Sequence, residues 1–206
     1  MTDILAIYGA GGHGKVVADL AEELGYQKVV FFDDEYAVKK KLEHWDVKGD
    51  FAALLADVSK YAGVIVAIGN NRVRLEKITL LINKGANVIS LIHPTANVSR
   101  YVSLGIGSVV CSNASVNAFA KIGMGAIINT NASVDHDCVL GQGVHICPGA
   151  SLAGNVIVGD FSWIGIGSSI IQQVSVGCDC FVAAGSVVVK DVLDSQKVKS
   201  NPAKPY

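Results

Sequence analysis

This 206-residue sequence lacks three features that point to particular partners or surroundings. Basic residues do not outnumber acidic ones, and the net charge of −1 predicts no nucleic-acid partner. No run approaches the roughly 18 uninterrupted apolar residues of a membrane-spanning helix, although 50% of the residues are apolar. Met1-Thr2-Asp3 is not the basic start of a secretory signal, so we expect a cytoplasmic protein without a membrane span.

A disulfide framework is missing as well. The five cysteines are an odd number, and their spacing matches no disulfide pattern, which fits a reducing compartment. Cys178 and Cys180 lie two residues apart, but no second pair of ligands accompanies them. We therefore expect no metal site.

The sequence has, by contrast, an uninterrupted six-residue period. A helix repeats every 3.6 residues and an ordinary strand every two, so neither produces this spacing. Hexapeptide repeats are typical of a parallel β-helix, in which three hexads close one triangular turn and the aliphatic residue points inward. A β-sandwich with chance periodicity is the alternative, but its turn signals do not keep a strict hexad. The aliphatic positions are Val98, Leu104, Val110, Val116, Ile122, Ile128, Val134, Leu140, Ile146, Leu152, Val158, Ile164, Ile170, Val176, Val182 and Val188.

The remaining positions of each hexad suit tight corners. A short side chain or a valine follows each aliphatic residue by four positions, as at Ala114 and Cys138. This places Cys138 in a packed position, where a thiol is usually inert. Asparagine tolerates the positive φ that a corner requires. We expect that role for Asn113, Asn117, Asn129, Asn131 and Asn155.

The first ninety residues follow a different pattern, in which strands alternate with helices. Apolar runs predict strands over 4–8, 28–32, 63–68 and 88–92, with helical periodicity between most of them. The polar stretch 39–50, which includes His44, is predicted to be a loop. The fold class is therefore an α/β half-Rossmann-like domain over residues 1–92, followed by a β-helix with a short tail over residues 93–206.

A glycine-rich turn follows the first predicted strand. Gly9, Gly11 and Gly14 fit the spacing G-x-G-x-x-G between a strand and a helix, and Asp33 and Asp34 end the next strand. Bare backbone at a helix N-terminus suits a diphosphate, and a carboxylate suits a ribose or a base. A nicotinamide cofactor normally needs both Rossmann halves, whereas a UDP- or GDP-sugar needs less surface. The alternative is that the glycines only form a tight turn.

Two histidines in the repeat region are candidates for chemistry. His136 lies between Asp135 and Asp137, and a carboxylate partner orients an imidazole and raises its pKa, which suits a general base. His145 also avoids the inward position, so we expect both side chains to face outward. The alternative for His136 is a surface histidine with acidic neighbours by chance. A third histidine, His13, lies inside the glycine loop.

The combination of these motifs resembles the bacterial sialic-acid/aminosugar acyltransferase family. The similarity is greatest to the UDP-4-amino-sugar N-acetyltransferases of bacillosamine synthesis, and it extends from the first strand to residues 201–203. It implies a left-handed coil, acetyl-CoA as co-substrate, and a homotrimer with active sites between subunits. Two departures are an aspartate at position 137, where glutamate is common, and Ser200, where glycine is usual.

The resemblance also implies roles for individual residues. His136 corresponds to the catalytic base and Asp137 to the acid that raises its basicity. His145 corresponds to a contact with acetyl-CoA, and Gly69 to a contact with the substrate. Further substrate contacts fall on Gly11, Gly12, His13, Asp33 and Asp34.

The spacing adds an expectation about the cofactor. Eighteen-residue turns stack Trp163 and Phe181 above His145, so the cofactor groove is predicted along this column. Gly154 and Gly165 are predicted to let pantetheine approach bare backbone. The alternative is that the two aromatic residues pack in a trimer interface.

Three functions follow as hypotheses. The first is acetyl transfer from acetyl-CoA to the C4 amine of a UDP-linked 4-amino-4,6-dideoxy sugar. The second is O-acetylation of sialic acid or another sugar hydroxyl with the same base. The third is a non-catalytic trimer that binds nucleotide sugars.

Overall fold

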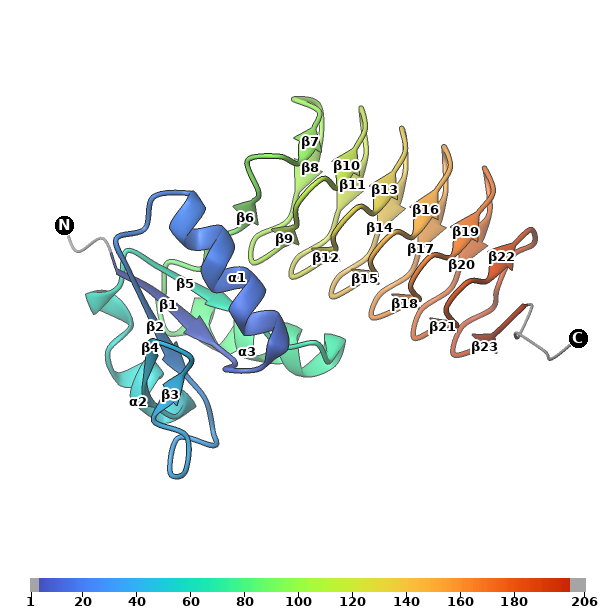
Figure 1. Cartoon of the computed structure of the whole chain (residues 1–206). Coiled ribbons are helices and arrows are strands. Elements are labelled where there is room, and N and C mark those ends of the chain that lie inside the picture. Colours follow the sequence, from blue (N-terminus) through green and yellow to red (C-terminus); the bar gives the residue numbers. More distant parts are fainter. Residues whose placement is uncertain (1–3, 201–206) are drawn as a thin grey trace, which may run out of the picture. The chain divides into compact units, whose positions relative to one another are not determined.

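The computed structural model describes residues 4–200 and divides the chain into two compact units, Met1–Pro94 and Thr95–Tyr206 (Figure 1). Residues 1–3 and 201–203, on which two of the expectations above fall, lie outside the described residues. Within the described residues, no helix combines the length and the hydropathy that a membrane crossing requires.

The first unit contains a five-stranded sheet with the order β3-β4-β2-β1-β5. The parallel core consists of β1 (Ile4–Tyr8), β2 (Lys28–Phe32) and β5 (Gly63–Val66). These strands are buried almost throughout, as their continuous apolar sequence predicts. Their carboxyl ends lead into the glycine loop, the acidic pair and Gly69, so the candidate substrate residues lie at one edge of the sheet.

Helices connect these strands. They are α1 (Gly12–Glu23), α2 (Phe51–Ala56), the 3-10 turn η1 (Val58–Lys60) and α3 (Asn71–Asn83). The side chains of Asp50 and Asn70 cap α2 and α3 by accepting hydrogen bonds from the main chain three residues on.

Two expectations for this unit are wrong. The stretch 39–50 is not a loop throughout: β3 (Lys41–Leu42) and β4 (Trp45–Gly49) form a hairpin, because Leu42 and Val47 are buried and anchor it. His44 itself lies in the turn between these strands and is exposed, as expected. Residues 88–92 do not add a strand to the sheet. Only an isolated bridge joins Val88 to Val64, and β6 (Leu91–Ile92) does not belong to the five-stranded sheet.

The second unit is a left-handed parallel β-helix, as expected (Figure 1). Each strand has two residues and pairs with the strand eighteen residues away, as Ser133 does with Ser115 and Ser151. One face contains β7 (Asn97–Val98), β10 (Ser115–Val116), β13 (Ser133–Val134), β16 (Ser151–Leu152), β19 (Ser169–Ile170) and β22 (Val187–Val188). The second contains β8 (Ser103–Leu104), β11 (Lys121–Ile122), β14 (Val139–Leu140), β17 (Ile157–Val158) and β20 (Ser175–Val176). The third includes β9 (Val109–Val110), β12 (Ile127–Ile128), β15 (His145–Ile146), β18 (Trp163–Ile164), β21 (Phe181–Val182) and β23 (Lys197–Val198).

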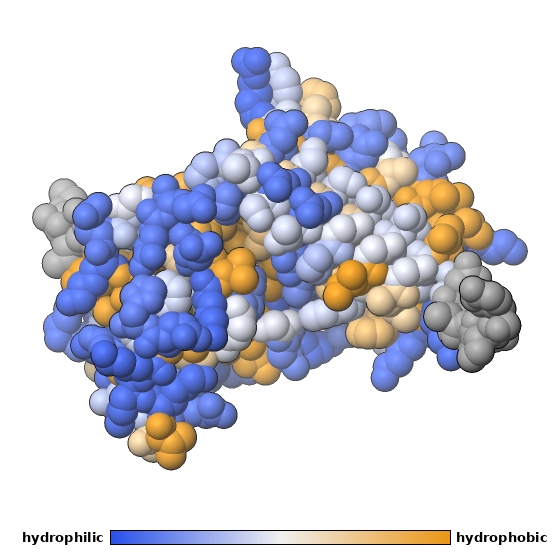
Figure 2. All heavy atoms as spheres, in the orientation of Figure 1, coloured by the Kyte–Doolittle hydropathy of each residue, from blue (hydrophilic) through white to orange (hydrophobic). Residues whose placement is uncertain are grey.

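The aliphatic rows form the core of this coil. The second residue of each strand points inward and packs against its equivalents in the adjacent turns, together with the short residues of the corners. Val98 and Leu104 are only partly buried because they lie near the first turn of the stack. Figure 2 shows mainly residues of intermediate hydropathy over the visible side of the coil, with apolar patches among them. Several large apolar side chains of the coil are exposed, including Ile106, Ile157 and Ile166.

The corners agree in part with expectation. Asn113, Asn131 and Asn155 have φ values of 55°, 56° and 59°, as a tight corner requires. Asn117 and Asn129 do not have positive φ; their amides instead contact Asp135 and His145.

Candidate active site

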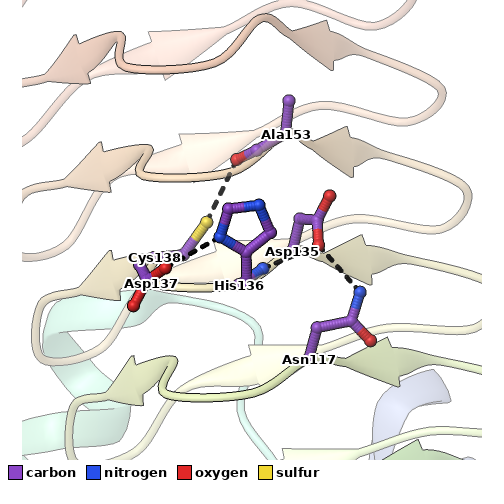
Figure 3. A network of polar contacts seen from close by, with 6 residues as sticks. All are labelled: Asn117, Asp135, His136, Asp137, Cys138 and Ala153. Carbon is purple, nitrogen blue, oxygen red and sulfur yellow. Dashed lines mark hydrogen bonds and ion pairs between the residues drawn. The ribbon is translucent and has the colours of Figure 1, made fainter.

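His136 lies at the corner between β13 and β14, and its side chain is 54% exposed. Its Nδ1 atom is 2.8 Å from Oδ2 of Asp137 (Figure 3). The hydrogen bond with Asp137 raises the pKa of His136, and the charges of Asp135 and Asp137 raise it further. Because the carboxylate accepts at Nδ1, the neutral ring has its proton there and its lone pair on Nε2, as a general base requires.

Asp135, the other acidic neighbour of His136, bonds the backbone of the corner and not the imidazole. Oδ1 of Asp135 accepts from the backbone N–H of His136 at 2.7 Å and from the amide of Asn117 at 2.9 Å (Figure 3). The Asn117 amide and then the His136 N–H lower the pKa of Asp135. Asp137 is therefore the partner of the imidazole, and Asp135 holds the backbone of the corner.

His145 is less accessible than expected. It lies on β15 and avoids the inward position, as expected, but it is only 6% exposed. Its Nε2 is 3.1 Å from the amide nitrogen of Asn129, and its ring lies 4.2 Å from that of Trp163. Asn129 and Trp163, from the coils on either side, cover the His145 ring, which the hexad pattern does not reveal.

The predicted column of aromatic residues is present. His145 pairs in register with Trp163, and Trp163 with Phe181. The rings of Trp163 and Phe181 are stacked, with an interplanar angle of 15° and centroids 6.4 Å apart. Trp163 is half-buried and Phe181 is 44% exposed, so the column offers an accessible aromatic surface on one face of the coil.

Gly154 and Gly165 do not present open backbone. Both are buried. A Cβ on Gly165 would lie 2.5 Å from the carbonyl oxygen of Val182 in the next coil, and one on Gly154 would lie 2.6 Å from Nε2 of His136. The reason for placing pantetheine against these two glycines is therefore wrong, and their contact with acetyl-CoA stays a prediction.

The glycine loop of the first unit contains two kinds of glycine: those that the turn requires and those with open space beside them. Gly9 has a φ of 111°, and a Cβ on Gly14 would lie 2.3 Å from the carbonyl oxygen of Gly9, so both are required by the turn itself. Gly11 and Gly12 are exposed, with nothing within 4 Å of an added Cβ. The space beside Gly69 is also open. Gly11, Gly12 and Gly69 therefore leave room for a ligand.

The acidic pair already has protein partners. Asp33 accepts from the backbone N–H of Ala10 at 2.7 Å and of Glu35 at 2.9 Å, so it ties the glycine loop to β2. Asp34 accepts from the backbone N–H of Phe51 at 3.2 Å. It also accepts a hydrogen bond from the hydroxyl of Tyr8, and the pKa of Tyr8 is raised by burial and then by Asp34. Direct nucleotide contacts of the pair stay a prediction.

Arg74 was missed by the sequence analysis. It is 1% exposed and donates hydrogen bonds to the carbonyl oxygens of Ile68 and Gly69, at 2.9 and 3.2 Å, and to Oδ1 of Asn71 at 2.9 Å. Burial lowers its pKa to about 10. Its spacing in the sequence could have indicated its burial, because Arg74 lies on the same helical face as Ile78, where a core residue is expected.

His13 is neutral near pH 7. Burial, and then the charge of Arg74, lower its pKa to about 4. Its Nε2 atom is buried without a hydrogen-bond partner. A neutral His13 can offer a ligand a hydrogen bond but no positive charge.

Comparisons with known proteins identify the family. A structure of the acetyltransferase domain of PglB from Neisseria gonorrhoeae FA1090, in complex with acetyl coenzyme A, matches this chain with a TM-score of 0.93. The sequences are 42% identical, and the match covers 100% of both chains. The model of the PglD N-terminal domain matches residues 4–81.

This chain belongs to the bacillosamine-type amino-sugar acetyltransferase family.

Two further similar proteins have names that contain different nucleotides, UDP in one and GDP in the other. UDP-N-acetylbacillosamine N-acetyltransferase of Bacillus subtilis (strain 168) is 33% identical over 112 residues, which are 52% of this chain; the chain spans about half (50%) of that relative's length. A histidine-to-alanine variant of GDP-perosamine N-acetyltransferase from Caulobacter crescentus, in complex with CoA and GDP-perosamine, is 38% identical with a TM-score of 0.92. That match covers 97% of this chain and 95% of the other.

The cysteines of this acetyltransferase lie mostly in packed positions. Cys138 is fully buried beside His136, and its Sγ donates to the carbonyl oxygen of Ala153 at 3.2 Å (Figure 3). Burial is the largest cause of its raised pKa, which keeps the thiol protonated and disfavours a covalent Cys–His route. Within residues 4–200, no group of three or more His, Cys, Asp or Glu side chains could hold a metal.

Proposed function

We propose that this acetyltransferase transfers the acetyl group of acetyl-CoA to the C4 amine of a UDP-linked 4-amino-4,6-dideoxy sugar. The observation that carries the proposal is the exposed His136–Asp137 pair on the coil, with Nδ1 held by the carboxylate and the pKa raised. The relatives crystallised with acetyl coenzyme A, or with CoA and a nucleotide amino sugar, support the two substrates.

The chemistry needs one base. As the amine nitrogen forms a bond to the thioester carbonyl carbon, Nε2 of His136 takes a proton from the amine. The carbon–sulfur bond then breaks, and CoA leaves with the electron pair on sulfur and is protonated to the thiol. General-base assistance of this kind contributes about 10²–10⁴ in rate, and alignment of both substrates contributes further. Asp137 stabilises the imidazolium that forms.

The nucleotide sugar would bind to the first unit. Gly11, Gly12 and Gly69 leave open space at the carboxyl edge of the sheet, and the N-terminus of α1 provides main-chain N–H groups for a diphosphate. His13 would act as a neutral hydrogen-bonding group. A homotrimer with active sites between subunits is part of the proposal, and sedimentation of the purified chain tests it.

A GDP-linked amino sugar is the second candidate, because the relative in complex with GDP-perosamine is similar over nearly the whole chain. The test supplies acetyl-CoA with a panel of UDP-, GDP- and CMP-linked sugars and measures CoA release and the mass of the product. We expect a UDP-linked 4-amino sugar to gain one acetyl group, while its 4-hydroxyl counterpart gains none. Acetylation of the hydroxyl sugar would indicate an O-acetyltransferase. Binding without turnover of any sugar would indicate the non-catalytic alternative.

A further inference from the structure

Gly154 lies one coil beyond His136, at the equivalent position of the next turn. The register shows this directly, because Ser133 pairs with Ser151 before the corner and Val139 with Ile157 after it. A Cβ built on Gly154 would lie 2.6 Å from both Cε1 and Nε2 of the imidazole and 3.3 Å from Cδ2. Each of the three nearest atoms therefore belongs to the His136 ring.

This glycine differs from the other packed glycines of the coil. At Gly123 and Gly159, an added Cβ would meet main-chain atoms of the next coil. The backbone of Gly154 does not require glycine, because its φ lies outside the left-handed region. The same corner position in the other turns has a side chain: Arg100, Ala118, His136, Gln172 and Lys190.

The coil cannot widen easily to admit a larger residue. The backbone N–H of Asn155 donates to the carbonyl oxygen of His136 at 3.0 Å. The thiol of Cys138 donates to the carbonyl oxygen of Ala153 at 3.2 Å. On the other side, the N–H of Gln173 donates to the carbonyl oxygen of Gly154 at 3.1 Å. Because the main chain is held on both sides, an added methyl group would displace the exposed imidazole. Figure 3 shows the ring directed toward the turn that contains Ala153.

We propose that Gly154 is a positioning residue, whose missing side chain leaves the space in which the His136 imidazole holds its hydrogen bond with Asp137 and presents Nε2. This deepens the proposed function, since the ring it places is the proposed base. Contact with the cofactor is the competing role for Gly154, and the two roles predict different measurements.

The experiment uses the full chain and four proteins: wild type, Gly154→Ala, His136→Ala and the double variant. We expect Gly154→Ala to lower kcat by roughly 10- to 100-fold with little change in KM for acetyl-CoA, since misplacement of a catalytic group by about 1 Å costs on this order. Gln172→Ala, in the same corner position one coil further, is the control and should retain the wild-type kcat.

Two measurements do not depend on activity. Proton NMR titration should show the pKa of His136 falling toward its ordinary value in Gly154→Ala, because the displaced ring loses Asp137; the His136→Ala spectrum assigns the resonance. Introduced into the wild type, Gly154→Ala should lower the melting temperature. Introduced into His136→Ala it should not, because there the methyl group meets no ring. These measurements remain decisive for Gly154 even if wild type acetylates none of the sugars.

Three results would overturn the proposal. The first is an unchanged His136 titration with a raised KM for acetyl-CoA, which would assign Gly154 to the cofactor. The second is an equal loss of melting temperature in both backgrounds, which would show main-chain packing. The third is a Gly154→Ala variant with wild-type kcat and wild-type titration.

Discussion

Nδ1 of His136 and Oδ2 of Asp137 lie 2.8 Å apart, although the two residues are adjacent in sequence. The contact is possible because Asp137 has a φ of 59°, the left-handed conformation of the coil's tight corners. The corner that the coil needs for closure therefore also places the carboxylate beside the imidazole.

Replacement of Asp137 by asparagine tests this pair. Asparagine has the required backbone conformation at three other corners, so the fold should be retained. The base works in its neutral form, and the raised pKa of His136 means that activity is lost as the pH falls through that pKa. Asp137→Asn should lower the maximal rate and move this acidic limb of the pH–rate profile to lower pH.

The matched control is Asp135→Asn, which removes a charge that also raises the pKa of His136 but leaves the ring contact. Its acidic limb should move less. If only the Asp135 variant changed the profile, the two acidic residues would have exchanged roles.

Removal of the base itself should abolish most turnover. His136→Ala should lower kcat by at least about 10²-fold. The melting temperature should change little, because the side chain is more than half exposed and packs into no core. Turnover is measured as thiol release from acetyl-CoA and folding by thermal melting. Near-normal kcat in a folded variant would exclude His136 as the base.

Gly11→Val should affect the nucleotide sugar alone. The position is exposed with open space beside it, so valine can be accommodated in the folded protein but should block a diphosphate from the backbone. We expect a raised KM for the nucleotide sugar and an unchanged KM for acetyl-CoA.

Gly14→Ala is the contrasting variant, since its Cβ would clash with the carbonyl oxygen of Gly9 and should prevent stable folding. Tight NAD binding by the wild type in calorimetry would instead support a dinucleotide site.

Trp163→Ala distinguishes a cofactor groove from a subunit interface. Loss of the ring between His145 and Phe181 should raise KM for acetyl-CoA while the sedimentation coefficient of the assembly stays the same. A dissociated assembly with unchanged KM would place the aromatic column in the interface instead.

Arg74→Lys tests the buried guanidinium. Lysine cannot bridge the carbonyl oxygens of Ile68 and Gly69 and the Asn71 side chain at once, so it should leave buried acceptors unsatisfied. We expect the free energy of unfolding to fall by about 1–3 kcal/mol in denaturant titration. The KM for the nucleotide sugar should rise, because the loop with Gly69 loses its support. An unchanged stability would mean that the loop does not depend on Arg74.

The sequence alone determined the coil. In a β-helix each hexad packs only against hexads one turn away, so a fixed period specifies the inward row, the corners and the stacking of Trp163 and Phe181 over His145. The parallel core of the first unit, its glycine loop and the Asp-His-Asp corner were also predictable, because strand, turn and helix signals there are local.

Only the tertiary structure decided how side chains share the available contacts. The carboxylates of Asp135 and Asp137 are equally close to His136 in sequence, and the backbone conformation of the corner separates them. The burial of His145 and of Arg74, and the imidazole above which Gly154 lies, depend on side chains from other turns or loops. A repeat predicts which positions stack, but the competition of neighbouring atoms for the same space and the same hydrogen bonds is resolved only in three dimensions.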